Sequence, residues 1–433
     1  MLAFNRHSEE NNLVDAAAGT TDKAVEKAAE LHEAANAVAI APVKPVKLAL
    51  VSSGLGNIHR GFEISTARWF HALDQHTDMD VRLFCGGKHE GGKQLWNFPR
   101  NSLWTRPFHY VPFMQEQQRW EMTYGAEQIS FWSALNFELL SFQPDVIWTK
   151  DIPLAYLLRA SRVAFNLNFK IIFANGGMLK PQNYADYDLV QQIENHAFDE
   201  ALQFGIPLEK MELLSNCVPA PAITSIEDAA RERTRTRESL GLEESDWVIV
   251  CVAAWNKYHK RIDYLLDEVG AIDDPNCKLL LCGAPEVDSD GLQEQGRRLL
   301  GDRVQWLNVT QERVSEILHA ADVFVLPSLR EHLGNAVVEA VLAGLPVVVH
   351  PHDGGRFVIE DEYWLTDLSA PGNLTNRLNW MRRNTRANLA RIKILQNNVS
   401  TRFSAEALAG KFEAMVKRAA NQSGSGNFCQ SKA

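Results

Sequence analysis

Short apolar runs alternate with stretches of helical spacing along most of the chain. The runs of the first half cover 46–51, 81–85, 146–148, 171–174 and 211–214, and those of the second half cover 247–252, 278–282, 304–307, 323–326 and 347–349. Near-continuous apolar runs separated by helices are typical of parallel strands that are buried on both faces. The pattern therefore predicts an α/β fold with two parallel sheets, each covered by helices.

The polar stretch 225–245 divides the two series of strands. We therefore expect a Rossmann-like domain over 45–220 and a second one over 221–400, followed by a helix over 401–420. The length of 433 residues fits this organisation, since domains average about 150 residues. The two ends, 1–44 and 421–433, offer little for a core to bury, so they are predicted to be disordered, the first with some helix.

Composition narrows the function classes. Acidic residues outnumber basic ones by 54 to 44, and the net charge of −10 argues against a chain built to bind nucleic acid. No apolar run reaches the roughly 20 residues of a membrane-spanning helix, and we do not expect the N-terminus to be a secretory signal. The six cysteines have no C-x-x-C spacing and are expected to be reduced thiols. These features predict a cytoplasmic protein, and a peripheral contact with the inner face of the membrane stays open.

The segment after strand 323–326 carries the strongest chemical signal. A helix is predicted from about Gly334 to Ala343, and the free N–H groups at its start would form an anion site suited to a diphosphate. Glu331 precedes this helix and Glu339 lies inside it. Two carboxylates that flank an anion site suit a ligand with hydroxyl groups at both ends. Such a ligand is a nucleotide sugar.

The same residues carry a resemblance to a known family. Glu331 and Glu339 have the spacing of the E-x7-E motif, and the stretch 340–355, AVLAGLPVVVHPHDGG, resembles glycosyltransferase family 4. The segments 322–328 and 209–218 are also similar to that family, with Cys217 where glycine is usual. The resemblance implies a GT-B fold with two Rossmann-like domains that face a central cleft, and a retaining reaction without metal or cofactor.

The resemblance also assigns roles on the donor side. It places Glu339 on the ribose, Glu331 on the transferred sugar, and the amides of Gly334 and Asn335 on the pyrophosphate. Lys260 follows the first strand of the second domain and matches the lysine that offsets charge on the leaving phosphates.

Two more donor-side residues are candidates. Lys257 is a candidate to replace the arginine that the family has where this chain has Trp255. His352 lies in a loop that should face the donor.

The first domain should supply the acceptor side. Gly54 and Gly56 follow its first strand and would let the backbone approach the donor phosphates, although packing alone is an alternative explanation. Arg60 is a candidate to hold an acceptor anion. Lys150 and Asn175 end two strands at positions where relatives often have histidine, and we expect both on the acceptor side.

Three conspicuous stretches are interpreted without a catalytic role. The arginine-rich run 230–241 is interpreted as the solvated face of a helix. Asp78-Met79-Asp80 has the spacing of the metal motif of other glycosyltransferases, but it precedes a strand and is interpreted as a solvated loop. For the aromatic-rich stretch 96–132, core or loop packing is preferred to an acceptor platform or a membrane-facing surface.

The expected function is transfer of a hexosyl-type sugar from a nucleoside diphosphate sugar to a hydroxyl of a glycan, lipid or small-molecule acceptor, as in polysaccharide biosynthesis. The resemblance implies a front-face reaction in which the departing phosphate helps to deprotonate the acceptor. Three alternatives stay open: a nucleotide-sugar epimerase on the same scaffold, a two-lobed sugar-binding protein without catalysis, and a degenerate transferase.

Overall fold

The computed structural model describes residues 44–58, 60–100, 102–105, 107, 111, 115–177, 179–219 and 226–422. The expectations for 1–43 and 423–433 therefore lie outside the described residues, as do residues 220–225 at the expected boundary between the two domains. All contacts described below lie within the unit that starts at Val46.

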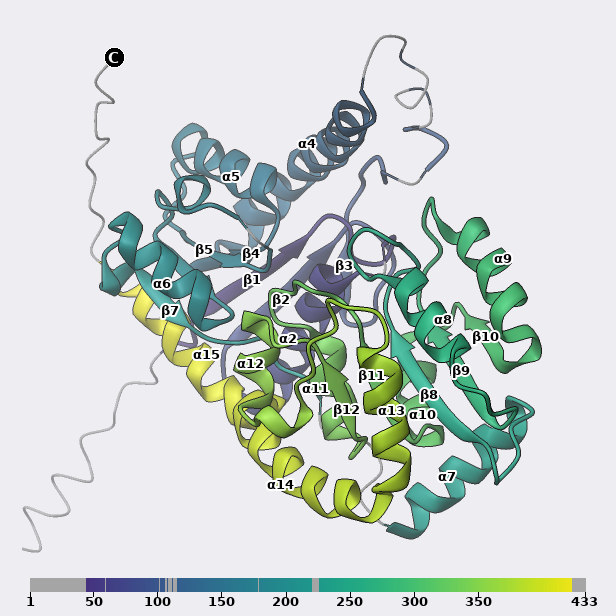
Figure 1. Cartoon of the computed structure of the whole chain (residues 1–433). Helices are drawn as coiled ribbons and strands as arrows, with labels where there is room; N and C mark the ends of the chain where they lie inside the picture. The colour runs from purple at the N-terminus through teal and green to yellow at the C-terminus, as the bar shows by residue number, and fades with distance from the viewer. Residues whose placement is uncertain are drawn as a thin grey trace, which may run out of the picture. The chain divides into compact units, whose positions relative to one another are not determined.

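The first half of the chain forms a sheet of seven parallel strands in the order β3-β2-β1-β4-β5-β6-β7 (Figure 1). The strands are β1 Lys47–Ser52, β2 Asp80–Cys85, β3 Gly92–Gln94, β4 Val146–Thr149, β5 Lys170–Asn175, β6 Leu189–Gln192 and β7 Met211–Leu213. With its helices α2 (Gly61–His76), α4 (Glu116–Phe142), α5 (Ile152–Ala164) and α6 (Asn195–Phe204), and the short η1 (Pro181–Asn183) and η2 (Leu208–Lys210), this sheet is called the first lobe.

Alternation along β1 shows how the two faces of this sheet are covered. Leu48 and Leu50 pack in one cluster with residues of α2 and of α15 (Ala405–Ala420). Ala49 and Val51 point the other way and pack with residues of α4 and α5. Both faces are therefore buried, as the near-continuous apolar runs predict.

The second half forms five parallel strands in the order β10-β9-β8-β11-β12, called the second lobe with its helices. The strands are β8 Trp247–Val252, β9 Cys277–Cys282, β10 Val304–Leu307, β11 Val323–Leu326 and β12 Val347–Val349. The helices are α7 Ile226–Ser239, α8 Ile262–Gly270, α9 Ser289–Leu300, α10 Gln311–Ala320, α11 Asn335–Leu342, α12 Asp353–Ile359, α13 Asn373–Arg383 and α14 Thr385–Phe403, with η3 Gly301–Arg303 and η4 Glu362–Trp364.

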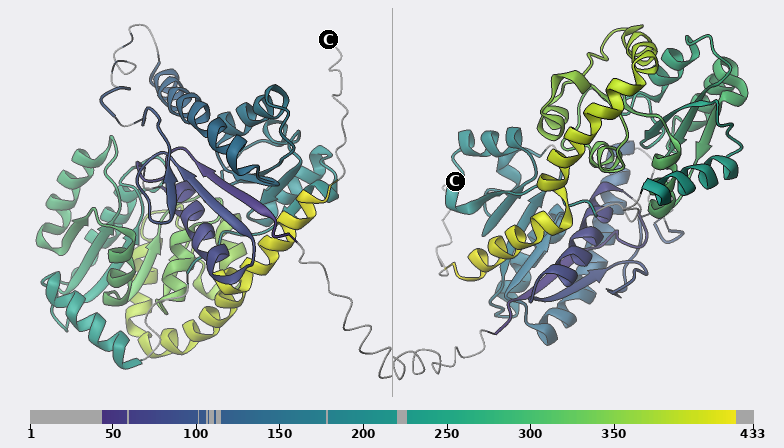
Figure 2. Two further views of the ribbon diagram at one scale, coloured as in Figure 1. Left: turned by 180° about the vertical axis from the view of Figure 1, so that it is seen from behind. Right: turned by 90° about the horizontal axis from the view of Figure 1, so that it is seen from below.

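The predicted α/β fold with two parallel sheets is confirmed, and every predicted strand is present within a residue or two of its expected limits. Two strands, β3 and β6, are not predicted by the apolar pattern. After α14 the chain does not stay with the second lobe, because α15 packs along α2 of the first lobe (Figure 2).

The solvated-face interpretation is wrong for part of the arginine-rich run. Arg231 and Arg235 of α7 are exposed. Arg237 is only 2% exposed, and it donates to the carbonyl oxygens of Ala320 and Asp246 and to Asp322 Oδ2. Arg237 therefore fastens α7 to the start of β11.

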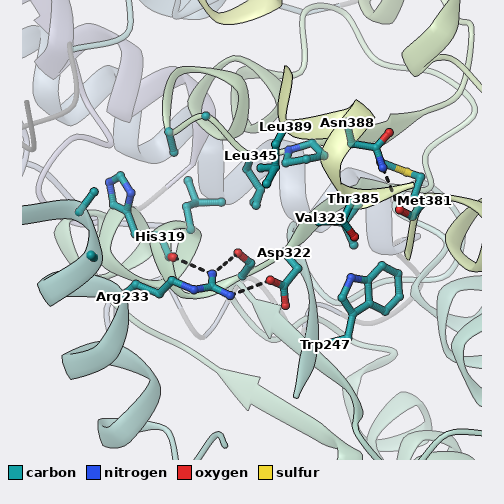
Figure 3. A pocket seen from close by; sticks show the side chains of 17 residues that line it. Arg233, Trp247, His319, Asp322, Val323, Leu345, Met381, Thr385, Asn388 and Leu389 are labelled. Atoms are coloured by element: carbon teal, nitrogen blue, oxygen red, sulfur yellow. Dashed lines mark hydrogen bonds and ion pairs between the residues drawn. The ribbon is translucent and has the colours of Figure 1, made fainter. Parts of the chain in front are cut away.

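A pocket of about 400 Å³ lies at the amino ends of β8 and β11 (Figure 3). Arg233 crosses it and donates to Asp322 Oδ1 and to the carbonyl oxygen of Ala321, each at 2.6 Å. Trp247 and Met381 also line it. The amino ends of parallel strands are the edge opposite to the carboxyl ends, so this pocket is separate from the site described below.

Three tryptophans of the aromatic-rich stretch do not pack in a core, because Trp96, Trp104 and Trp120 are exposed. Trp96 and Trp120 contact the nearby rings of Phe98 and Tyr124, at 4.8 and 5.1 Å between centroids. Trp132 does pack, with its Nε1 donating to Ser161 Oγ at 2.6 Å, whereas Phe108, Tyr110 and Phe113 lie outside the described residues. Among the helices that the structure describes, none is long and apolar enough to cross a bilayer.

Candidate functional site

The carboxyl ends of β8 and β11 bring Lys260 and Glu331 together. Lys260 Nζ donates to Glu331 Oε1, and His259 Nε2 lies 3.6 Å from the same oxygen. The buried Asn256 shapes the loop that carries both residues, because its Oδ1 accepts the backbone N–H groups of His259 and Lys260 at 3.1 and 2.8 Å. Asn256 is thus a supporting residue that the sequence analysis missed.

The charge of Glu331 is set by two opposing effects. Burial raises the pKa of this carboxyl group, but the charge and hydrogen bond of Lys260, with smaller contributions from His259 and Ser328, together outweigh burial and hold the net pKa of Glu331 below its usual range. Glu331 is therefore ionised at neutral pH although its side chain is mostly buried.

The helix α11 begins at the predicted place. Gly334 caps it with φ of +76°, a left-handed conformation that glycine adopts without strain. Asn335 is the first residue of the helix, and its Oδ1 accepts from Asn216 Nδ2 of the first lobe at 3.2 Å. The start of α2 lies opposite, since a Cβ added at Gly61 would be 3.9 Å from Asn335 Nδ2.

Both oxygens of Glu339 have partners. Arg68 of α2 donates to Oε1 at 2.7 Å, and Gln311 of α10 donates to Oε2 at 2.9 Å. Arg68 and Glu339 are 9% and 13% exposed, so this ion pair between the lobes is largely shielded from water. Arg68 gave no signal in the sequence, because it lies in the middle of a helix and its partner is 271 residues away.

A third contact between the lobes involves His332, another residue that the sequence analysis missed. His332 Nε2 lies 3.2 Å from the carbonyl oxygen of Asn175, close enough to donate a hydrogen bond. Burial lowers the pKa of His332 to about 4, so the imidazole is neutral at physiological pH. The side-chain Nδ2 of Asn175 donates instead to Gln192 Oε1 at 2.8 Å, within the first lobe.

His352, the residue before α12, lies near Glu331 within the second lobe. Its Nδ1 accepts the backbone N–H of Gly355 at 2.9 Å, which leaves the proton of the neutral ring on Nε2. Burial lowers the pKa of His352 to about 4. Its Nε2 is buried and has no hydrogen-bond partner among the residues that the structure describes. It is thus an N–H group available to a ligand.

The first-lobe glycines are explained by packing. A Cβ at Gly54 would lie 2.4 Å from Glu63 Oε1, and a Cβ at Gly56 would lie 2.4 Å from the backbone of Gly87. Gly56 also has φ of +87°. Gly56 therefore requires glycine for contacts within the lobe, whatever it does toward a ligand, whereas a Cβ at Gly54 would displace the ends of the Glu63 and Arg100 side chains.

Arg60 and Lys257 differ in their position relative to the site. Arg60 is exposed and directly precedes Gly61, the residue opposite Asn335, so it lies at the edge of the site and its contact with an acceptor stays a prediction. Lys257 is also exposed, its backbone N–H donates to Asp288 Oδ2, and its Nζ lies beside Gly291 of α9 rather than at the Lys260–Glu331 pair. Trp255, in the place of the family's arginine, is buried with its ring 5.0 Å from that of Trp306.

A buried group of charges lies beneath Gly54 in the first lobe. Arg100 pairs with Glu127 at 2.7 Å and with Glu63 at 3.6 Å. Burial, with the charge of Asp151 second, raises the pKa of Glu63 to about 7. The sequence gives no sign of this group, because its members come from four separate segments.

These observations place the Lys260–Glu331 pair before the start of α11 in the second lobe, and the first lobe touches α11 at Asn335 and Glu339. Residues 232–394 match the family model of glycosyl transferases group 1. This group 1 segment extends from α7 into α14 and so contains Lys260, Glu331, Glu339 and His352.

Two curated proteins are similar to part of the chain. An uncharacterized glycosyltransferase of Methanocaldococcus jannaschii is 29% identical over 162 residues, which is 37% of this chain and 41% of that protein. The N-acetyl-alpha-D-glucosaminyl L-malate synthase of Bacillus anthracis is 26% identical over 118 residues, 27% of this chain and 31% of that protein. The chain thus spans less than half the length of either relative.

The likeness of fold extends further than the likeness of sequence. HepE of Anabaena, solved in complex with UDP and glucose, superposes with a TM-score of 0.67 over 86% of this chain and 99% of that chain, at 16% identity. At this identity the likeness shows the fold alone, and it confirms the predicted GT-B architecture.

Proposed function

We propose that this protein is a retaining, metal-independent glycosyltransferase of family 4. It would transfer a hexosyl group from a nucleoside diphosphate sugar to a hydroxyl of a glycan, lipid or small-molecule acceptor. The observation that carries the proposal is the Lys260–Glu331 pair beside the start of α11, the helix that contains Glu339. All three residues lie inside the segment that matches glycosyl transferases group 1.

Each element of this arrangement has a chemical task in the proposal. The free N–H groups at the start of α11 and the Lys260 ammonium stabilise negative charge as the diphosphate leaves. The ionised Glu331 accepts hydrogen bonds from hydroxyls of the transferred sugar, and the Nε2–H of His352 donates one from beside it. Glu339 accepts hydrogen bonds from the ribose.

The carboxylate that would bind the ribose, Glu339, already has a hydrogen-bond partner on each oxygen. Since Arg68 and Gln311 each hold one oxygen of Glu339, a ribose hydroxyl has to displace or share one of them. Donor binding at Glu339 would thereby be linked to the contact between the lobes, as expected for an enzyme that opens and closes around its substrate.

Thermal unfolding in the presence of nucleotide sugars tests the proposal. UDP-glucose is the first candidate donor because HepE is solved with UDP and glucose. A donor at 100 times its dissociation constant should stabilise the folded protein by about 2.7 kcal/mol and raise its melting temperature. Glu339→Ala should lose this shift. The control Lys47→Met, which changes the first residue of β1 at the amino end of the strand, should keep it.

The binding experiment is followed by product analysis. Mass spectrometry should show sugar added to an acceptor hydroxyl, whereas an epimerase would consume the donor with no acceptor present. If no nucleotide sugar shifts the melting temperature of the wild-type protein, the proposed function is wrong.

A further inference from the structure

The carboxyl end of β4 carries a buried lysine that has no acidic partner. Lys150 is 3% exposed, and its Nζ donates to Ser65 Oγ at 2.6 Å and to Asn216 Oδ1 at 2.8 Å. Both partners are neutral, and no ion pair of Lys150 with a carboxylate occurs among the residues that the structure describes. A fully buried ammonium without a counter-charge is costly, so this position favours a neutral amine.

The titratable groups that face Lys150 do not supply the missing charge. Burial lowers the pKa of Lys150 to about 7, and the opposing influence of Cys217 and of Glu63 on α2 is smaller. Burial raises the pKa of Cys217 to about 12 and that of Glu63 to about 7, so the thiol is neutral and the carboxyl is ionised only in part at neutral pH. His332 of the second lobe is neutral, and Arg68 of α2 acts on Cys217 as a further positive group.

A direct chain of hydrogen bonds joins Lys150 to the start of α11. Asn216 accepts from Lys150 through Oδ1 and donates through Nδ2 to Asn335, the first residue of that helix. The amide of Asn216 thus lies between the lysine and the proposed diphosphate site. A dianionic or trianionic ligand there would stabilise the charged form of the lysine.

We infer that Lys150 takes up a proton from solvent when a nucleoside diphosphate binds at the start of α11. Its amine becomes an ammonium, and the first lobe thereby adds one positive charge to the group that holds the leaving diphosphate. Lys150 acts through Asn216 and is a positioning residue, not the acceptor contact that the sequence suggests. The inference rests on the proposed function.

The linkage gives the sign of the pH dependence. Without ligand the lysine is charged below about pH 7 and neutral above it, and with ligand it stays charged to higher pH. The affinity for a nucleoside diphosphate is therefore highest below pH 7 and falls by about tenfold per pH unit above it, until the pKa of the bound state is reached. The last phosphate ionisation, near pH 6, is complete in this range and adds no slope.

Calorimetric titration with UDP, ADP and GDP tests the inference. Each is titrated at pH 7.5 and 8.5, in two buffers that differ in ionisation enthalpy, so that proton uptake is measured directly. For the diphosphate that binds best, the wild-type dissociation constant should rise by up to about eightfold over this interval, with uptake of up to about 0.75 proton at pH 7.5 and close to one at pH 8.5. Lys150→Met should bind more weakly, with a flat pH profile and no uptake, and Lys47→Met should behave as wild type.

The outcomes separate the inference from the proposed function. Binding by the wild-type protein without proton uptake, or uptake that persists in Lys150→Met, overturns the inference and leaves the proposed function standing. Failure of all three diphosphates to bind overturns both. Methionine has a length and volume similar to those of lysine, and Lys150→Gln replaces it if Lys150→Met does not fold.

Discussion

Replacing Lys260 by alanine should lower the turnover of sugar transfer by about 100- to 1000-fold. The variant loses the positive charge beside the leaving diphosphate. It also leaves the mostly buried Glu331 without the ammonium that holds its pKa down, so the carboxylate that should orient the sugar becomes partly protonated. Turnover is measured at saturating donor and acceptor, with the melting temperature recorded to show that the fold is intact.

A matched control is available on the surface. Lys417 of α15 pairs with Glu413 at 2.8 Å and is half exposed, so Lys417→Ala should retain wild-type turnover. Turnover of Lys260→Ala within about threefold of wild type, less than about 1 kcal/mol in barrier height, would contradict the assigned role.

Replacing Arg237 by alanine should destabilise the second lobe by about 2–3 kcal/mol. The guanidinium is 2% exposed, and its loss leaves Asp322 with one arginine fewer and the carbonyl oxygens of Ala320 and Asp246 without their donor. Urea denaturation followed by circular dichroism should show a lower midpoint for the variant than for the wild-type protein.

Arg235 on the same helix is the matched control, because its side chain is 67% exposed and its pair with Glu232 lies on the surface. Arg235→Ala should change the free energy of unfolding by no more than about 0.5 kcal/mol. If both variants unfold at the same midpoint, the inward role of Arg237 is wrong.

The sheets could be predicted because most strands are continuous apolar runs, and β6 shows the limit of that signal. Half of this strand consists of Gln191 and Gln192, which are fully buried. Gln191 Oε1 accepts from Trp148 Nε1, and its Nε2 donates to the carbonyl oxygen of Leu214, each at 2.7 Å. Polar residues whose partners lie far away in the sequence, here on β4 and just after β7, cannot be recognised as buried from a local pattern.

The site shows the same division between local and distant information. Glu331, Gly334 and Glu339 lie within one strand–loop–helix segment, so their spacing is visible in the sequence. Arg68 and Asn216 approach α11 only after both sheets have formed and packed. Arg68 and Asn216 can therefore be recognised from the structure but not from the spacing of residues in the sequence.

The last helix has a consequence for dissecting the molecule. Leu408, Phe412 and Met415 of α15 are buried in one cluster with Leu48 and Trp69. The earliest and latest parts of the described chain thus form a single hydrophobic core. No single cleavage of the polypeptide can therefore separate the two lobes and leave the core of the first lobe complete. A fragment ending at the last residue of α14 would expose the apolar side of α2 to water. The first lobe can therefore complete its core only after α15 has been synthesised.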